Sequence, residues 1–236
     1  MNTIGFILER HSDLSFVSDS PLLDTKILLC HVIECPQENL YLNQQYCLTS
    51  RQLSAFNELF RRRLSGEPIA YLTGYKGFWS LNLRVSKSTL IPRPETELLI
   101  EKALELPLLQ NATVLDLGTG CGAIILALSR ERPTWVCTGI EIQRDALRIA
   151  EANCASHHVK NVKFLHGDWY QPVLDQKYHL IVSNPPYVAN GDKHLSNLNL
   201  RFEPRSALIS GEDGMRDLTH IICKSPEYLL NGGWML

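Results

Sequence analysis

The chain has 236 residues, and its 23 Lys and Arg nearly balance its 25 Asp and Glu, which gives a formal net charge of −2. Hydrophobic residues make up 44% and charged residues 20%, so the composition excludes a wholly disordered or fibrous protein. Apolar runs stay short of the ~18 residues of a membrane span, and the first residues lack the pattern of a secretory signal. We therefore expect a cytoplasmic protein with no membrane partner, and the near-neutral charge argues against stable binding of nucleic acid.

The cysteine pattern argues against a metal site. The sequence holds 7 cysteines, an odd number with no Cys-x-x-Cys pair among them. Structural zinc sites use closely spaced ligand pairs. We therefore predict reduced thiols, several of them in the core, and no metal.

The first third of the chain is predicted to be helical. Ser20 followed by Pro21 is typical of a helix start, and apolar residues at helical spacing continue as far as Pro36. A second helix is predicted from about Thr49, where Gln52 completes a capping-box pattern, and it ends before a Gly-Glu-Pro run.

Three consecutive arginines, Arg61, Arg62 and Arg63, fall in the last turn of this second helix. Cations at that position complement the helix dipole. We interpret the triplet as structural in preference to a nucleic-acid patch.

The pattern changes after residue 70. Leu81, Leu83 and Val85 alternate with polar residues, which is strand periodicity, and we place the turns at Gly74 and Gly77. The predicted parts of the chain are a helical domain at 1–69, a β-hairpin linker at 70–91 and a further domain at 92–236.

The third part alternates short apolar runs with helical patterns. Apolar strands buried on both faces, each followed by a helix, predict an α/β fold with a doubly wound parallel sheet. The predicted strands are 113–117, 135–140, 162–166 and 179–183, and the predicted helices are 95–106, 122–131, 143–155 and 215–230. A Gly-Gly pair at 232–233 followed by apolar residues indicates the start of another strand, so we expect a domain cut short at its C-terminal end.

A glycine-rich loop, Asp-Leu-Gly-Thr-Gly-Cys-Gly at 116–122, follows the first of these strands and opens a helix. Gly118 and Gly120 allow a tight turn and a close approach to a ligand at the carboxyl edge of the sheet. Glu141, at the end of the next strand, is placed to accept hydrogen bonds from ribose hydroxyls. Together they predict a ribose-bearing cofactor but not which one, because Ala123 completes a dinucleotide pattern as well.

The acidic residues near this loop help to separate the candidate cofactors. Asp116 directly precedes the glycines, where a carboxylate would repel a pyrophosphate and attract a cation. S-adenosylmethionine carries an ammonium and a sulfonium, so it suits this electrostatic environment. Trp169 is placed to stack on adenine and Asp168 to accept from its amino group, although a tryptophan covering the domain edge is the alternative.

The fourth strand ends in Asn184, Pro185, Pro186 and Tyr187. The two prolines fix the backbone and supply no N–H, so backbone carbonyls and the Asn184 side-chain oxygen form a rigid cluster of acceptors. Such a cluster suits a planar –NH₂ group, held by Asn184 and the Pro185 carbonyl with Tyr187 on its flat face. Held in this way, the nitrogen lone pair is directed at a methyl donor, and positioning supplies much of the rate. An ordinary rigid turn is the structural alternative.

With these residues in view, the chain resembles the bacterial protein-(glutamine-N5) methyltransferases that modify class 1 peptide chain release factors. Part of the resemblance is shared by many amino-methylating enzymes and lies in the residues just described. The more specific part lies outside the cofactor fold. It consists of Gly-Glu-Pro-Ile-Ala-Tyr-Leu-Thr-Gly at 66–74, Leu-Ile-Pro-Arg-Pro-Glu-Thr-Glu at 90–97 and Arg-Phe-Glu-Pro at 201–204. Glu141 stands where this family more often has aspartate.

The resemblance implies methyl transfer from S-adenosylmethionine to the side-chain amide nitrogen of the glutamine in the Gly-Gly-Gln motif of the release factor, leaving S-adenosylhomocysteine. The helical domain would dock the release factor, and the enzyme is expected to be a monomer. The implied cofactor contacts are Asp116, Gly118, Thr119, Gly120, Cys121, Gly122, Glu141, Asp168, Trp169 and Asn184. The implied substrate contacts are Asn184, Pro185, Pro186 and Tyr187, with Asn184, Pro185 and Tyr187 as the catalytic group.

Three alternatives stay open from the residues alone. Adenine presents the same planar –NH₂ as glutamine, so an adenine-N6 methyltransferase acting on nucleic acid fits the turn at 184–187. The glycine loop taken alone also fits an NAD-dependent oxidoreductase, and a non-catalytic binding module could keep the fold.

The stretch 206–216, rich in Ser, Gly and Asp, is a candidate flap over the substrate.

Overall fold

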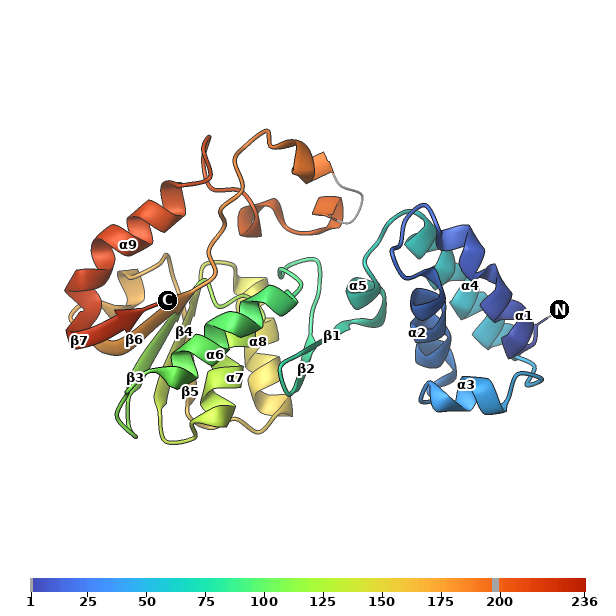
Figure 1. The fold of residues 1–236 in the computed structure, drawn as a ribbon, viewed down its shortest axis with the longest axis horizontal. Coiled ribbons are helices and arrows are strands. Elements are labelled where there is room, and N and C mark those ends of the chain that lie inside the picture. Colours follow the sequence, from blue (N-terminus) through green and yellow to red (C-terminus); the bar gives the residue numbers. More distant parts are fainter. Residues whose placement is uncertain (1, 197–199) are drawn as a thin grey trace. The chain divides into compact units, whose positions relative to one another are not determined.

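The computed structural model describes residues 2–196 and 200–236. These divide into two compact units, which are considered separately (Figure 1). One unit contains the described residues of 2–74 and of 196–202, and the other contains 75–195 and 203–236.

The first unit is helical. Its apolar core contains Phe56 and Phe60 of helix α4 (Ser50–Leu64), Leu28 and Leu29 of helix α2 (Pro21–Ile33), and Ile7 of helix α1 (Ile4–Glu9). The two phenylalanines are four residues apart and therefore share one face of their helix. Its α-helices are α1 (Ile4–Glu9), α2 (Pro21–Ile33), α3 (Glu38–Leu42), α4 (Ser50–Leu64) and α5 (Ile69–Thr73), with a 3₁₀ helix at Arg10–Leu14.

Both helix starts predicted in this unit are confirmed. Pro21 is the first residue of α2 and Ser20 is its N-cap, although the Ser20 side chain makes no capping hydrogen bond. The Gln52 backbone N–H donates to the Thr49 hydroxyl over 3.2 Å, and the Thr49 backbone N–H donates to the Gln52 side chain over 2.9 Å. This reciprocal pair is the predicted capping box, and it fixes the start of α4.

The arginine triplet at the end of α4 is held by carboxylates. Arg61 pairs with Glu58 and Arg62 pairs with Glu67, each over 2.8 Å. Arg63 is buried, donates to Asp24 of α2 over 2.8 Å and donates to the Val17 carbonyl over 2.6 Å. These contacts stabilise the helical unit, in line with the structural interpretation of the triplet.

The predicted hairpin is present, but its turn is not where we placed it. Strands β1 (Tyr75–Phe78) and β2 (Leu81–Arg84) are antiparallel, with Phe78 opposite Leu81. Gly74 instead ends α5 with φ +79°, and Gly77 lies inside β1 opposite Asn82. Placing the turns at these glycines was therefore wrong.

The turn is formed by Trp79 and Ser80, and contacts from elsewhere in the chain hold it. Trp79 adopts φ +52°, which is uncommon for a bulky residue. Its backbone N–H donates to Glu97 over 2.7 Å and its indole N–H donates to Glu131 over 2.8 Å. Such tertiary support is not visible in local sequence.

The second unit contains the predicted doubly wound parallel sheet. Its strands are β3 (Thr113–Leu117), β4 (Val136–Glu141), β5 (Val162–His166), β6 (Tyr178–Ser183) and β7 (Leu229–Met235), and all neighbouring pairs in the order β5-β4-β3-β6-β7 are parallel. Its α-helices are α6 (Glu97–Glu105), α7 (Ala123–Glu131), α8 (Arg144–Ser156) and α9 (Arg216–Tyr228). The four internal strands predicted from sequence agree within one residue at each end. The last predicted helix ran into β7, because Leu229 and Leu230 suit a helix as well as a strand.

Helices cover both faces of this sheet. Figure 1 shows α6, α7 and α8 on one side and α9 on the other. Successive residues of a strand face opposite sides, so Leu115 and Leu117 of β3 join the apolar cluster that includes Ile221 of α9. Asp116 lies between them and faces the side of α7. No helix within the described ranges is long and apolar enough to cross a membrane.

Candidate active site

The carboxyl ends of three adjacent strands bring the predicted site residues to one edge of the sheet. Leu117 of β3 is paired with Ile140 of β4 and with Ser183 of β6. The residues that follow them along the chain are Gly118, Glu141 and Asn184. The sheet register therefore places the glycine loop, the ribose-binding candidate and the Asn-Pro-Pro-Tyr turn side by side.

The glycine loop folds back on the sheet edge through its backbone. The N–H groups of Gly118 and Thr119 donate to the Ile140 carbonyl over 3.0 and 2.9 Å. Gly118, Gly120 and Gly122 all have positive φ, which a residue with a Cβ adopts only at a cost. At Gly118 an added Cβ would lie 3.4 Å from the Trp169 ring, so the glycine also makes room for that ring.

Asp116 is a buried carboxylate beneath this loop. It is 0% exposed, and its Oδ2 accepts from the Thr119 hydroxyl over 2.6 Å. Its Oδ1 has no hydrogen-bond partner among the described residues. Burial raises the pKa of Asp116 from the ordinary 3.8 to about 7, with the nearby Glu141 adding to the effect and the Thr119 hydrogen bond opposing it. A carboxyl with an unsatisfied buried oxygen is a group that a nearby cation would stabilise.

Glu141 is oriented by the backbone. Its Oε2 accepts from the Gly120 N–H over 2.9 Å, and its Oε1 accepts from the Gln143 N–H over 2.8 Å. The side chain is only 8% exposed but lines the pocket described next. Each carboxylate oxygen has two lone pairs, so Glu141 keeps acceptor capacity for hydroxyl groups of a ligand.

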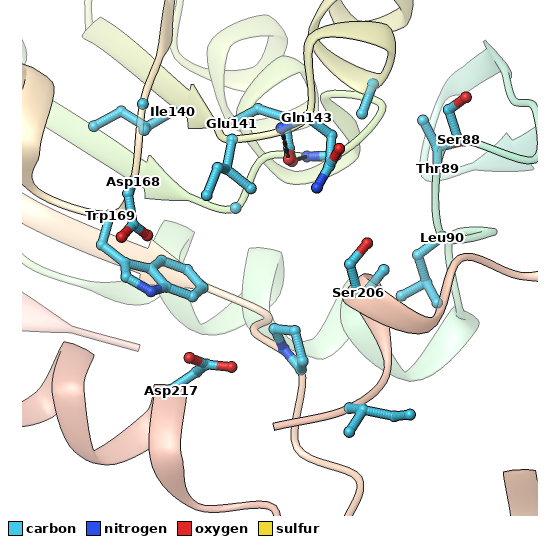
Figure 2. A pocket seen from close by; sticks show the side chains of 18 of the residues that line it. Ser88, Thr89, Leu90, Ile140, Glu141, Gln143, Asp168, Trp169, Ser206 and Asp217 are labelled. Atoms are coloured by element: carbon cyan, nitrogen blue, oxygen red, sulfur yellow. Dashed lines mark hydrogen bonds between the residues drawn. The ribbon is translucent and has the colours of Figure 1, made fainter. Parts of the chain in front are cut away.

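These elements enclose a cavity of about 430 Å³. Figure 2 shows Asp168 and Trp169 at one end of the pocket and Leu90 and Ser206 at the other. The indole of Trp169 projects between the carboxylates of Asp168 and Asp217. The lining residues are Ser88, Thr89, Leu90, Gly118, Gly120, Ile140, Glu141, Ile142, Gln143, Ala146, Gly167, Asp168, Trp169, Pro186, Ser206, Ala207, Ile209, Arg216 and Asp217.

The ionisable groups that line this pocket are mainly acidic. Glu141, Asp168 and Asp217 are carboxylates, and Arg216 is the cation among the lining residues. Arg216 donates to both oxygens of Asp217 over 3.1 and 3.0 Å. The unbalanced negative charge of the pocket favours a ligand with cationic groups and opposes a pyrophosphate.

The Asn-Pro-Pro-Tyr turn leaves β6 beside this pocket. The Asn184 side-chain N–H donates to the Thr96 hydroxyl over 3.3 Å, which leaves the Asn184 Oδ1 to accept from another group. Pro185 is buried, Pro186 lines the pocket, and Tyr187 is 63% exposed. The Asn184 end of the turn is therefore held in place, and the Tyr187 side chain at its other end is accessible.

The stretch 206–216 lies against this turn. The Val188 N–H donates to the Leu208 carbonyl over 2.9 Å, and the Ser210 N–H donates to the Val188 carbonyl over 3.0 Å. A Cβ added to Gly214, at φ +80°, would lie 2.4 Å from the Tyr187 carbonyl oxygen. We call residues 203–214 the strap, because residues in this range pack along the turn at 184–187 and line the pocket.

The structure brings together some of the predicted site residues in the pocket lining and places others outside it. The predicted residues that line the pocket are Gly118, Gly120, Glu141, Asp168, Trp169 and Pro186. The predicted residues outside the lining are Asp116, Thr119, Cys121, Gly122, Asn184, Pro185 and Tyr187. Burial raises the pKa of Cys121 to about 12, so this thiol stays protonated.

Sequence reasoning assigned no site role to several pocket residues, including Leu90 and Asp217, whereas Ser206 and Arg216 fall in the stretch 206–216 that was predicted as a flap. The motif at 90–97 was an available signal for Leu90, because it carried the resemblance but had no assigned role. No cluster of three or more His, Cys, Asp or Glu that could hold a metal ion occurs within residues 2–196 and 200–236.

Comparisons with known proteins identify the family. Residues 94–203 match the model of the methyltransferase small domain, and residues 12–74 match the PrmC N-terminal domain. The release factor glutamine methyltransferase of Aliivibrio fischeri is 49% identical over 93% of this chain and 78% of its own length. The chain belongs to the release factor glutamine methyltransferase family. The Vibrio cholerae member is 47% identical over 93% of the chain and 77% of its own length.

A solved structure supports the fold of this family member. The catalytic domain of hMettl16, crystallised with a MAT2A 3'UTR hairpin, superimposes with a TM-score of 0.52 at 18% identity. The match covers 64% of this chain and 59% of that one. At this identity the likeness shows the methyltransferase fold and carries no information about the substrate.

Proposed function

We propose that this family member transfers a methyl group from S-adenosylmethionine to the side-chain amide nitrogen of the glutamine in the Gly-Gly-Gln motif of class 1 release factors. The observation that carries the proposal is the environment of Asn184. Its N–H is directed to Thr96, and its Oδ1 is left as an acceptor at the end of β6. The names of the relatives supply the substrate class.

The residues present fit this cofactor. The acidic pocket and the unsatisfied Oδ1 of Asp116 favour a ligand that carries positive charge. Glu141 would accept from the ribose hydroxyls, and Trp169 with Asp168 would hold the adenine, at the end of the pocket where Figure 2 shows them. When bound, the cofactor supplies an electrophilic methyl group on a sulfonium.

The chain's own contribution to the reaction is to orient a weak nucleophile. An amide nitrogen has a delocalised lone pair, so it reacts poorly until that lone pair is directed at an electrophile. Asn184 Oδ1 and the Pro185 carbonyl would accept from the two N–H groups, and Tyr187 would pack on the plane of the amide. Orientation of this kind can supply several kcal/mol, roughly 7 to 11 at the upper limit.

The helical unit would dock the release factor. It forms a compact body with its own apolar core, and residues 12–74 match a domain model distinct from the methyltransferase one. We propose the boundaries predicted from sequence, a docking domain at 1–69, a linker at 70–91 and a methyltransferase domain at 92–236, and a monomeric enzyme.

Incubation with methyl-labelled cofactor, a purified class 1 release factor and bulk RNA tests the substrate class. We expect label in the release factor and none in the RNA. Asn184→Ala should lose transfer while its affinity for S-adenosylhomocysteine falls much less, because Asn184 mainly positions the substrate. Label in RNA alone would overturn the proposal, and wild-type turnover by Asn184→Ala would remove the role assigned to Asn184.

A further inference from the structure

Two segments far apart in sequence form the walls at one end of the pocket. Residues 88–90 form one part of the lining, and Ser206, Ala207 and Ile209 of the strap form another. Figure 2 shows Ser88, Thr89, Leu90 and Ser206 together at this end, away from Asp168 and Trp169. Neither segment belongs to the parallel sheet, so their relative position depends on contacts outside it.

Glu203 links these two walls. Its carboxylate accepts from the Ile91 backbone N–H over 3.2 Å and forms an ion pair with the Arg93 guanidinium. The Glu203 side chain is 1% exposed, whereas the Arg93 side chain is 36% exposed. A buried carboxylate is costly unless it is paired and hydrogen-bonded, so this glutamate strongly favours the arrangement in which both segments meet.

Glu203 is the first residue of the strap, and the rest of the strap leads from this carboxylate to the turn at 184–187. Five residues along, the Leu208 carbonyl accepts from the Val188 N–H, and the Ser210 N–H donates to the Val188 carbonyl. Val188 directly follows the Asn-Pro-Pro-Tyr turn. Displacing the strap would therefore disturb the backbone next to Tyr187. Gly118 is held separately by the Ile140 carbonyl, and Glu141 by the Gly120 N–H.

We propose that Glu203 is a positioning residue for methyl transfer, which clamps the strap to the Leu90 wall and so shapes the acceptor end of the pocket. This inference rests on the proposed function. Arg93 is the second half of the clamp, because it supplies the charge that makes the buried carboxylate stable. The motifs at 90–97 and 201–204, which carried much of the family resemblance, acquire a shared role in this way.

The test compares Glu203→Gln, Arg93→Met and Arg93→Lys with the wild type. Glu105→Gln is the matched control, since it removes an ion pair with Lys102 whose two side chains are 64% and 55% exposed. For each protein we would measure kcat and KM for the release factor, the Kd of S-adenosylhomocysteine, and amide hydrogen exchange at Val188 and Ser210. The exchange measurement needs no substrate, so it tests the clamp even if methyl transfer fails.

We expect Glu203→Gln and Arg93→Met each to lower kcat/KM for the release factor by about tenfold or more. Exchange at Val188 and Ser210 should accelerate by a similar factor, about tenfold, while the cofactor affinity stays unchanged. Arg93→Lys should retain more activity than Arg93→Met, and the double variant should resemble the single ones because the two residues act as a pair. Glu105→Gln should match the wild type.

Two results would overturn the clamp. One is unchanged exchange at Val188 and Ser210 in Glu203→Gln. The other is faster exchange throughout the unit with loss of cofactor binding, even in Arg93→Lys, which would make Glu203 an ordinary core residue. A wild-type enzyme that methylates no release factor would instead refute the proposed function, and the exchange data would still decide on the clamp.

Discussion

Single residues at the sheet edge act mainly by orienting one another. Glu141 is held by two backbone N–H groups, Asn184 by Thr96, and Asp116 by Thr119. Each of these side chains keeps at least one oxygen lone pair beyond its internal hydrogen bond. Some residues predicted from sequence, such as Glu141, line the pocket, whereas Thr119 was predicted and orients a neighbouring side chain. Thr96, which orients Asn184, had no predicted role.

Thr96 offers a direct test of this orientation. Thr96→Val keeps the shape of the side chain but removes the acceptor for the Asn184 N–H, so the Asn184 amide is free to rotate. We expect kcat to fall by about ten- to a hundredfold, with unchanged affinity for S-adenosylhomocysteine by calorimetry. Thr96→Ser retains the hydroxyl and should keep most of the activity. Equal kcat values for Thr96→Val and the wild type would show that the hydrogen bond is not used.

The raised pKa of Asp116 predicts that the stability of the folded chain depends on pH. Its pKa is raised from 3.8 to about 7 in the folded chain, so between these values the folded state holds a proton that the unfolded state has released. The stabilisation that Asp116 contributes is therefore fully present below the lower pKa, and it is lost as the pH rises through the higher pKa. Asp116→Asn does not titrate and can still accept from Thr119.

The measurement is urea unfolding of wild type and Asp116→Asn over this pH range at constant ionic strength. The free energy of unfolding of the wild type minus that of the variant should fall as the pH rises from about 4 to about 7, and then level off. Parallel stability curves would mean that Asp116 has an ordinary pKa in the folded chain.

At the scale of elements, backbone geometry constrains the strap at Gly214, and Gly191 offers a comparison outside the strap. Gly214 and Gly191 both have positive φ, of +80° and +95°. A Cβ at Gly214 would lie 2.4 Å from the Tyr187 carbonyl oxygen, whereas a Cβ at Gly191 would meet no heavy atom of the described chain within 4 Å. Comparing the two positions thus separates the effect of conformational strain from the effect of displacing the turn at 184–187.

We expect Gly191→Ala to lose roughly 1 kcal/mol of stability, because alanine is strained at positive φ. Gly214→Ala should lose more, because its Cβ would also lie 2.4 Å from a backbone oxygen. Gly214→Ala should in addition lower methyl transfer by about tenfold or more, since the turn at 184–187 must shift to admit the methyl group. Thermal unfolding and single-turnover assays would measure the two effects. Equal activity in the two variants would argue that the strap does not position the turn.

The accuracy with which local sequence predicted the bounds of helices, strands and turns differs from one element to another. The strands β3 to β6 were predicted within a residue, because continuous apolar runs between turns leave little choice. The hairpin turn at Trp79 was missed because contacts from Glu97 and Glu131 stabilise it. The short helices α1 and α5 lack the length that makes a helical period visible.

The same distinction applies to the candidate site. Residues 116–122, 141 and 184–187 follow strands and have characteristic chemistry, so sequence could place them at one edge. Thr96 and Glu203 could not be assigned a role, because their partners lie 88 and 112 residues away along the chain. Local patterns contain no information about such pairings.

For the whole molecule, the account predicts that the two units have separable tasks. Arg63 and Asp24 form a buried pair in the helical unit, with side chains 6% and 10% exposed. Asp24→Asn removes the buried carboxylate that pairs with the Arg63 charge and should destabilise this unit by about 3–5 kcal/mol. Methyl transfer to the release factor should fall, while affinity for S-adenosylhomocysteine is kept, because the pocket proposed to hold the cofactor lies in the other unit.

Glu58→Gln is the matched control for Asp24→Asn. It removes the exposed partner of Arg61, a pair worth about 0–1 kcal/mol, and should leave transfer unchanged. Full activity of Asp24→Asn, despite lower stability of the helical unit, would contradict a docking role for that unit.

The central claim is that the enzyme methylates one glutamine of a release factor. Its most direct test is mass spectrometry of a purified class 1 release factor after incubation with the enzyme and S-adenosylmethionine. We predict replacement of one hydrogen by one methyl group, located by fragmentation on the side chain of the Gly-Gly-Gln glutamine and absent with Asn184→Ala. A methyl group on any other residue, or none on the release factor while RNA is modified, would contradict it.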